Sequence, residues 1–258
     1  MRALAAALLA AFAATQAPAC DYPGPPPGAG EARADGAGIV WAGFSDATRR
    51  YDHGILGDDW EAGGLRALAG AQGPCDLAVI LPETRVFEDT GPRLADLDGD
   101  GAPEIIVVET DIARGATLAV YGLSGGRLVK LAATAPIGRS HRWLAPVAIA
   151  DLDGDGSVEI AYIDRPHLAR ILRILRYETG GATARLVEIA SAQGHTNHRI
   201  GDAAIAGGLR FCAGRPELIT LSPDWSTLLA TSFAGGRLVT QPVGRNTPPA
   251  LALAMRCR

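Results

Sequence analysis

The sequence has no block of Lys or Arg, and its 24 basic residues are outnumbered by 28 acidic residues, which gives a net charge of -4. A surface that binds nucleic acid or anionic lipid needs clustered positive charge. We therefore expect neither as a partner. Beyond the first residues, the chain also has no apolar run long enough to cross a bilayer, so we expect no membrane span.

Signatures of catalysis are also scarce. The sequence has no H-E-x-x-H motif and no phosphate-binding loop, and no Ser or Cys lies in a recognisable setting for a nucleophile. Asp164 and His167 resemble a catalytic pair, but Pro166 between them favours a turn. An enzyme is therefore the less favoured interpretation.

The cysteines form no C-x-x-C pair of the kind found in zinc or redox sites. An even number of cysteines in an oxidising compartment suggests disulfides, for which three pairings are possible. We favour Cys20 with Cys75 and Cys212 with Cys257, because these bonds would attach each terminus to its nearest repeat. Buried free thiols are the alternative.

The N-terminus has the pattern of an export signal. Met1 and Arg2 precede an apolar run, and Ala17-Pro18-Ala19 fits a signal peptidase site, so residues 1–19 are predicted to be a signal peptide. The protein would then be periplasmic or extracellular. Lipidation of Cys20 is an alternative, although Ala17 is a poor substitute for the leucine-like residue that such a site requires.

Residues 20–37 are predicted to be a leader, because residues 23–37 are too rich in Pro and Gly for a regular element and should be poorly ordered. The folded domain would span residues 38–258.

An internal repeat organises this domain. The pattern D-x-D-G-D-G-x-x-E occurs at 96–104 and again 55 residues later at 151–159, each time before an apolar run. Glycine pairs at 125–126, 180–181 and 235–236 follow the same period. A second similarity, between 57–66 and 201–210, suggests units at both ends. We expect about four units, centred on residues 55–90, 91–140, 141–195 and 196–245.

Within each unit, short runs rich in leucine and β-branched residues are bounded by Gly, Pro, Asp and Asn, and no helical period is sustained. The sequence therefore predicts an all-β chain. Units of strand, loop, strand, turn, strand, turn and strand must stack to bury both faces, which favours a β-propeller of four or five antiparallel four-stranded blades. Residues 38–47 are predicted to close the ring as an outer strand of the last blade.

The two acidic loops have the composition of calcium sites. Alternating carboxylates converge on one point, and Gly99 and Gly101 permit the positive φ angles of a tight loop. An EF-hand would need Glu at position 12, which is Val107 or Tyr162 here. A plain acidic turn is the alternative, but carboxylates about 4 Å apart repel by roughly 4 kcal/mol per pair without a cation. The predicted Ca²⁺ ligands of the two sites are Asp96, Asp98, Asp100, the Ala102 carbonyl and Glu104, and Asp151, Asp153, Asp155, the Ser157 carbonyl and Glu159.

The repeated loop and its apolar strand resemble the FG-GAP or VCBS repeat of integrin alpha-subunit propellers and exported bacterial proteins. The resemblance is strong over residues 91–195 and faint over 50–90 and 196–245. It implies Ca²⁺ between two blade strands and an adhesion or ligand-binding role. Such propellers commonly have seven blades, whereas this chain has room for four or five.

Polar residues recur just before the first strand of each unit, where a propeller would bring them together at one mouth of its channel. We predict a calcium-binding, ligand-binding or scaffold module whose partner is a protein, a glycan or a small anionic ligand. A hydrolase acting at the channel mouth is the alternative function. Each of these residues could instead contact a neighbouring blade or face water. The residues are His53, Arg93, His141, Arg142, His198 and Arg199.

Overall fold

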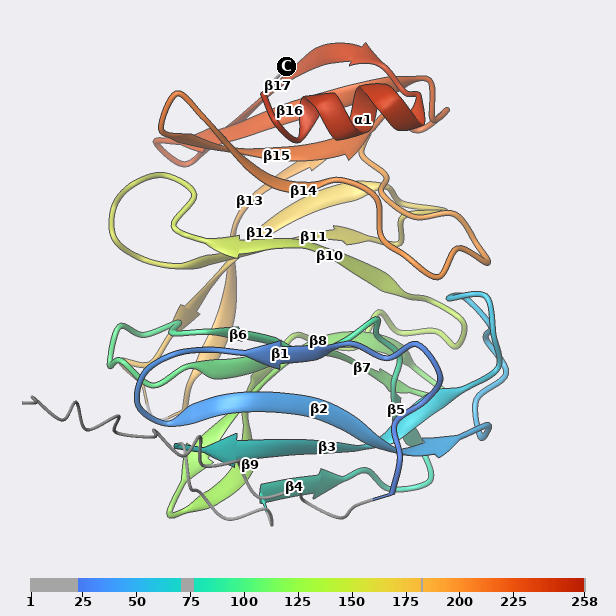
Figure 1. Ribbon diagram of the computed structural model, residues 1–258, viewed down its shortest axis with the longest axis vertical. Helices are drawn as coiled ribbons and strands as arrows, with labels where there is room; N and C mark the ends of the chain where they lie inside the picture. The colour runs from blue at the N-terminus through green and yellow to red at the C-terminus, as the bar shows by residue number, and fades with distance from the viewer. Residues whose placement is uncertain (1–22, 71–76, 182, 258) are drawn as a thin grey trace, which may run out of the picture.

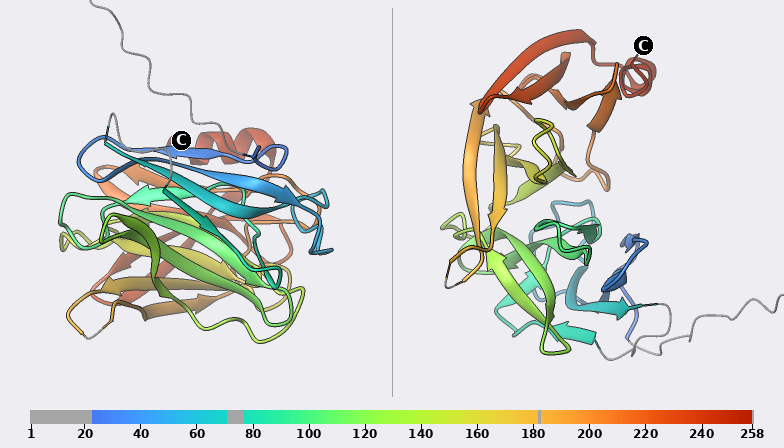
Figure 2. Two further views of the ribbon diagram at one scale, coloured as in Figure 1. Left: turned by 90° about the horizontal axis from the view of Figure 1, so that it is seen from below. Right: turned by 90° about the vertical axis from the view of Figure 1, so that its left-hand side faces the viewer.

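The computed structural model describes residues 23–70, 77–181 and 183–257, and this part of the chain is built almost entirely of antiparallel strands (Figure 1). The predicted all-β class is confirmed. The strands form three sheets, which lie one above another in chain order and follow a curved path in the side view of Figure 2.

The second and third sheets each have four strands in sequential order, as predicted for one unit. In the second sheet, the acidic loop at 151–159 connects the first strand to the second strand. The second sheet consists of β10 (Leu144–Ala150), β11 (Glu159–Asp164), β12 (Ile171–Glu178) and β13 (Arg185–Gln193). The third consists of β14 (Gly208–Cys212), β15 (Arg215–Leu221), β16 (Thr227–Ala234) and β17 (Arg237–Arg245).

The first sheet is larger than predicted, with nine strands among the described residues. Two groups of strands are joined through a single residue pair, Ala62 of β3 with Phe87 of β5, so two expected units share one sheet. Its strands are β1 (Glu31–Arg33), β2 (Ile39–Thr48), β3 (Glu61–Ala69), β4 (Leu77–Ile80), β5 (Arg85–Phe87), β6 (Arg93–Ala95), β7 (Glu104–Asp111), β8 (Gly115–Ser124) and β9 (Arg127–Ala133).

The strands beside the acidic loops are buried on both faces. On β7, Ile105 and Val107 pack against β2 and β3, whereas Ile106 and Val108 pack toward the second sheet. The same alternation on β11 directs Ile163 toward the third sheet. Successive side chains of a strand point to opposite faces, so stacked sheets bury each of these strands completely.

Two expectations about the N-terminal part are wrong. Residues 38–47 do not join the last sheet, because β2 pairs with β3 over most of its length. The predicted leader also contains β1, which pairs with β2, and Gly30 N–H donates to the Thr90 carbonyl (2.8 Å). The backbone hydrogen bonds of residues 30–33 and the bond from Trp41 Nε1 to Glu31 (2.9 Å) fix this segment.

The similarity between 57–66 and 201–210 does not reflect equivalent positions. β3 lies between two strands of its sheet, whereas β14 is at the edge of its sheet. The two segments instead touch, since a Cβ at Gly57 (φ +94°) would lie 2.5 Å from the Gly201 carbonyl oxygen. Only glycine fits this approach.

A short helix, α1 (Pro248–Ala254), follows the third sheet and was not predicted. The Thr247 hydroxyl caps it by accepting from Ala250 N–H (3.2 Å). The disulfide between Cys212 and Cys257 ties the end of the helix to β14 and confirms one predicted pairing. Cys20 and Cys75 lie outside the described residues. In the described ranges, no helix has the length and apolar character that a membrane crossing requires.

Candidate metal centre

Each acidic loop connects the first strand of a unit to its buried second strand, β6 to β7 and β10 to β11. Glu104 and Glu159 are the first residues of those buried strands. Leu97 and Leu152, the second residues of the loops, are 5% and 3% exposed and pack in the core. Each loop is therefore anchored to the core near both ends.

Backbone N–H groups organise the first loop around Asp96. Its carboxylate accepts from Gly99 (2.8 Å), Asp100 (3.1 Å) and Gly101 (2.9 Å). Glu104 Oε2 accepts from Leu97 N–H (2.9 Å) and closes the loop. Charge-assisted hydrogen bonds of this kind are strong and hold the carboxylates in fixed positions.

The second loop repeats this pattern. Asp151 accepts from Gly154 N–H (2.7 Å) and Gly156 N–H (3.0 Å), and Glu159 Oε2 accepts from Leu152 N–H (2.8 Å). The two sequence repeats thus fold into the same turn.

The glycines of both loops adopt positive φ angles, as predicted: +78° at Gly99, +85° at Gly101, +80° at Gly154 and +90° at Gly156. A Cβ at any of these positions would meet no heavy atom within 4 Å. Glycine is therefore required by the backbone conformation and not by lack of space.

Three carboxylates converge in each loop. One oxygen each from Asp96, Asp98 and Glu104 lies within 4.8 Å of the other two, and Asp151, Asp153 and Glu159 form the same cluster. Carboxylate oxygens are the ligands that Ca²⁺ prefers, so the donor set fits this ion.

The other predicted ligands lie outside the three-carboxylate clusters. Asp100 and Asp155 each accept a hydrogen bond from the backbone two residues on, from Ala102 N–H (2.7 Å) and Ser157 N–H (2.8 Å). Neither belongs to the three-carboxylate clusters. Their coordination, and that of the Ala102 and Ser157 carbonyls, stays a prediction.

The electrostatic surroundings of the closing glutamates differ. Burial raises the pKa of Glu104 to about 7; the charges of the three loop aspartates add to the shift and the Leu97 N–H opposes it. Burial also raises the pKa of Glu159, and hydrogen bonds from Leu152 N–H and Arg176 oppose the shift without reversing it. Glu159 therefore has a cationic partner.

A second candidate site is a cleft of about 300 Å³ between loops of different sheets. The volume is at the lower end of the range for small-molecule sites. The structure brings three of the predicted ligand-binding residues here, His53, His141 and Arg142. The lining residues are His53, Ile55, His141, Arg142, Trp143, Arg165, His167, Leu168 and Ile200.

The other predicted cleft residues lie elsewhere. His198 is buried behind the cleft, where its ring packs against Trp143 (centroids 4.8 Å apart) and its Nε2 contacts the Asp202 carbonyl (2.7 Å). Arg93 forms a two-pronged ion pair with Asp89 (2.8 and 3.0 Å). Arg199 stacks over the Trp225 ring at 4.3 Å.

Sequence reasoning missed the residue that orients His53. His53 Nδ1 contacts the fully buried Glu88 carboxylate, which also accepts from the Thr110 hydroxyl (2.6 Å). Glu88 is 35 residues from His53 along the chain, and no local pattern links the two. His167 was assigned to a turn, where it lies, but its place in the cleft was not predicted.

Two serines lie in settings that resemble those of catalytic nucleophiles. Ser140 Oγ contacts His141 Nδ1 (3.0 Å), and His141 Nε2 contacts Asp52 (3.0 Å), which is the residue order of a hydrolytic triad with the two imidazole nitrogens exchanged. The Asp52 side chain is 90% exposed. Ser124 matches the letters G-x-S-x-G but precedes a two-residue hairpin turn and strand β9, where a nucleophile elbow would lead into a helix.

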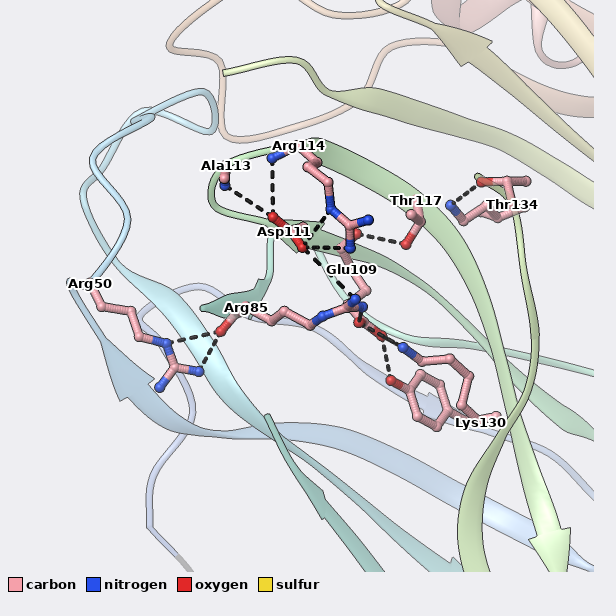
Figure 3. Close-up of polar contacts among 11 residues, drawn as sticks. Arg50, Arg85, Glu109, Asp111, Ala113, Arg114, Thr117, Lys130 and Thr134 are labelled. Atoms are coloured by element: carbon pink, nitrogen blue, oxygen red, sulfur yellow. Dashed lines mark hydrogen bonds and ion pairs between the residues drawn. The ribbon is translucent and has the colours of Figure 1, made fainter. Parts of the chain in front are cut away.

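A buried charged cluster around Glu109 was not predicted from the sequence (Figure 3). The Glu109 carboxylate on β7 is fully buried and accepts from Tyr121 (2.5 Å), Lys130 (2.7 Å) and Arg85. Burial raises the pKa of Glu109, but these hydrogen bonds outweigh it and lower the pKa overall. The cluster connects β5, β7, β8 and β9.

Comparison with known families agrees with the loop geometry. Residues 96–162 match the family model described as an FG-GAP-like repeat. The match begins at the first acidic loop, includes the second and ends within β11. The chain therefore contains an FG-GAP-like repeat, as the resemblance predicted. No curated protein matches the chain.

Proposed function

We propose that this protein is a ligand-binding or scaffold module in which each acidic loop binds one Ca²⁺. One observation carries the proposal: three carboxylates converge twice, 55 residues apart, in loops with matching hydrogen bonds. The FG-GAP-like repeat over the same residues supports it. The described acidic clusters contain no nitrogen or sulfur ligand, which favours Ca²⁺ over Zn²⁺.

The role of the metal is structural. Each loop joins a strand with a single partner strand, β6 or β10, to a strand buried on both faces, so a cation that gathers the carboxylates fixes the start of the buried strand. Without a cation, carboxylates about 4 Å apart repel by roughly 4 kcal/mol per pair at an effective dielectric constant near 20. Ca²⁺ removes this repulsion and stabilises the folded chain.

The cleft lined by His53, His141 and Arg142 is the proposed ligand site. Imidazole and guanidinium groups donate hydrogen bonds to anionic groups, and Trp143 and Ile55 provide apolar contact. A small anionic ligand, or an acidic group on a protein or glycan, fits this chemistry.

Export is also part of the proposal. Residues 1–19 would be removed as a signal peptide, residues 20–37 would lead into the domain of residues 38–258, and the protein would act in the periplasm or outside the cell. The Cys212–Cys257 disulfide is typical of such oxidising compartments. The proposal also treats the stacked sheets as blades of a propeller with four or five blades.

The calcium proposal predicts that chelation lowers the melting temperature. A ligand at 100 times its dissociation constant stabilises the folded state by about 2.7 kcal/mol per site. Thermal unfolding should be measured with excess Ca²⁺ and with excess chelator, with metal content verified by elemental analysis. Asp98→Asn should remove part of the calcium-dependent shift. Equal melting temperatures after verified metal loss would contradict a structural role.

A hydrolase is the second candidate, favoured by the Ser140–His141–Asp52 chain of hydrogen bonds beside the cleft. It ranks second because water competes with His141 for the exposed Asp52 carboxylate. Hydrolysis of activated ester and phosphoester probes should be compared between the wild type and Ser140→Ala. Activity that this substitution removes would support the enzyme, whereas no activity above background would exclude it for these probes.

A further inference from the structure

The two acidic loops share their hydrogen-bond pattern but differ in what lies beside the closing glutamate. On the first loop, Gly122 of β8 lies next to Glu104, since a Cβ at Gly122 would be 3.7 Å from Glu104 Cγ. On the second loop, Arg176 of β12 is the direct cross-strand partner of Glu159. The corresponding place is thus a glycine in one repeat and an arginine in the other.

Arg176 points into the carboxylates of its own loop. Its Nε donates to Glu159 Oε1 (3.0 Å), and its Nη2 contacts the same oxygen. Nη2 also lies 3.1 Å from Asp155 Oδ2 and 3.6 Å from Asp153 Oδ2. A guanidinium stays protonated at any ordinary pH, so it is a permanent positive charge among three of the four acidic side chains of this loop.

The first loop has no such charge. Across residues 23–70, 77–181 and 183–257, no ion pair reaches its four acidic side chains, Asp96, Asp98, Asp100 and Glu104. Tyr177, which follows Arg176 and points to the opposite face of β12, belongs to the same core cluster as Leu97 of the first loop. Burial and the charges of Glu104, Asp98 and Asp100 raise the pKa of Tyr177, which places this neutral group near the first loop.

We propose that Arg176 is a tethered counter-ion of the second loop, so that the first loop binds Ca²⁺ more tightly and the second binds it only when the guanidinium moves away. This inference rests on the proposed function, because it assumes that both loops are calcium sites. It adds that the two sites are not equivalent.

The physical reason is competition for the same oxygens. A Ca²⁺ held by Asp153 and Glu159 needs carboxylate oxygens that Arg176 now contacts, and the two cations repel each other. The Arg176 side chain is 26% exposed, and a long arginine side chain can turn its charged end toward water. The apparent affinity of the loop is its intrinsic affinity multiplied by the fraction of molecules in which the guanidinium has left.

Calorimetric titration of the full chain with CaCl₂ tests the difference between the sites. We expect two classes of site in the wild type, with dissociation constants at least tenfold apart. Asp98→Asn should abolish the tighter class and Asp153→Asn the weaker class. These substitutions are matched, because each removes one charge from the equivalent position of its loop.

Arg176→Gln, made in the Asp98→Asn background to isolate the second loop, tests the cause. Calcium affinity of that loop should rise at least tenfold. Arg185→Gln in the same background is the control, because Arg185 is an exposed arginine of the adjacent strand β13 that pairs with Glu178. It should leave the affinity unchanged. Circular dichroism should verify that each variant is folded.

Several outcomes overturn the proposal. Equal affinities in the wild type would refute the difference between the loops, and unchanged or weaker binding in Arg176→Gln would refute competition by the guanidinium. If Arg176→Gln does not fold, the calcium affinities measured for Asp98→Asn and Asp153→Asn still test whether the two loops differ. Absence of calcium binding in every variant would refute the proposed function itself, whereas two equal sites would refute only the role of Arg176.

Discussion

At the residue scale, the chain buries several ionisable groups whose protonation the fold controls. Glu61, at the start of β3, is 4% exposed and lines a small pocket with Asp58 and Asp89. Burial raises its pKa to about 10, and the charges of Glu88, Asp58 and Asp89 add to the shift. Glu61 is therefore protonated in the folded state at neutral pH.

This protonation has a consequence for stability. In the unfolded chain the Glu61 carboxyl ionises near pH 4.5, whereas in the folded chain it stays neutral until about pH 10. Between these values the unfolded state binds fewer protons, so the free energy of unfolding decreases as pH rises, by at most about 1.4 kcal/mol per pH unit. Glu61→Gln is neutral at every pH and should be more stable than the wild type, by a margin that grows from pH 5 to pH 9.

Urea denaturation at several pH values measures this margin. Glu83→Gln is a suitable control, because the Glu83 side chain is 88% exposed and its substitution should give no margin that grows with pH. A constant difference between Glu61→Gln and the wild type across this range would contradict the prediction.

At the scale of elements, the Glu109 cluster holds four strands of the first sheet together. Its cations are only partly buried, with side-chain exposures of 28% for Arg85 and 33% for Lys130, whereas the Glu109 side chain is fully buried. The carboxylate is therefore the central acceptor of the cluster. Its removal leaves two cations without their buried partner.

Glu109→Gln should destabilise the fold by about 3 kcal/mol, the lower end of the range for breaking a buried ion pair, because both cations can turn toward water. Glu178→Gln, at the exposed pair with Arg185, should change stability by less than about 1 kcal/mol. Chemical denaturation of both variants measures the contrast. Similar losses in the two variants would show that the buried cluster contributes no more than a surface pair.

The sequence separation between interacting residues explains which contacts could be predicted from the sequence and which could not. The acidic loops were predictable because their hydrogen bonds join residues at most seven positions apart, so the motif contains its own partners. The contact between His53 and Glu88 spans 35 positions and follows from no local pattern. Arg176 lies 17 positions from Glu159, and its role becomes visible only when the strand register pairs the two residues.

At the scale of the whole molecule, stacking of the sheets was predicted from the repeat, but the assignment of strands to sheets at the N-terminus was not. Residues 38–47 were expected to join the last sheet, but the hydrogen bonds of β2 with β3 place them in the first. Between the second and third sheets, apolar side chains of β11 and β12 pack against Leu218 and Phe233. His195 is buried between these two sheets, since its backbone N–H donates to the Arg170 carbonyl and its ring contacts Thr220 of the third sheet.

His195 follows β13, is 2% exposed, and contacts the Thr220 hydroxyl of β15 through Nδ1 (2.9 Å). Burial lowers its pKa from 6.5 to about 4. The folded state therefore keeps His195 neutral while the unfolded state takes up a proton below pH 6.5. The stabilisation present above pH 6.5 is lost as pH falls toward 4, by at most about 1.4 kcal/mol per pH unit.

His195→Gln keeps a side chain that can contact Thr220 but cannot be protonated. Its free energy of unfolding should decrease less steeply than that of the wild type between pH 6.5 and 4. Its stability at pH 7.5 should be lower than that of the wild type, because glutamine does not have the shape of imidazole. His141→Gln is the control, because the His141 side chain is 45% exposed in the cleft and lies outside this interface. If the free energies of unfolding of His195→Gln and the wild type decreased in parallel between pH 6.5 and 4, protonation of His195 would not destabilise the contact between the second and third sheets. The loss of stability in acid would then come from other groups.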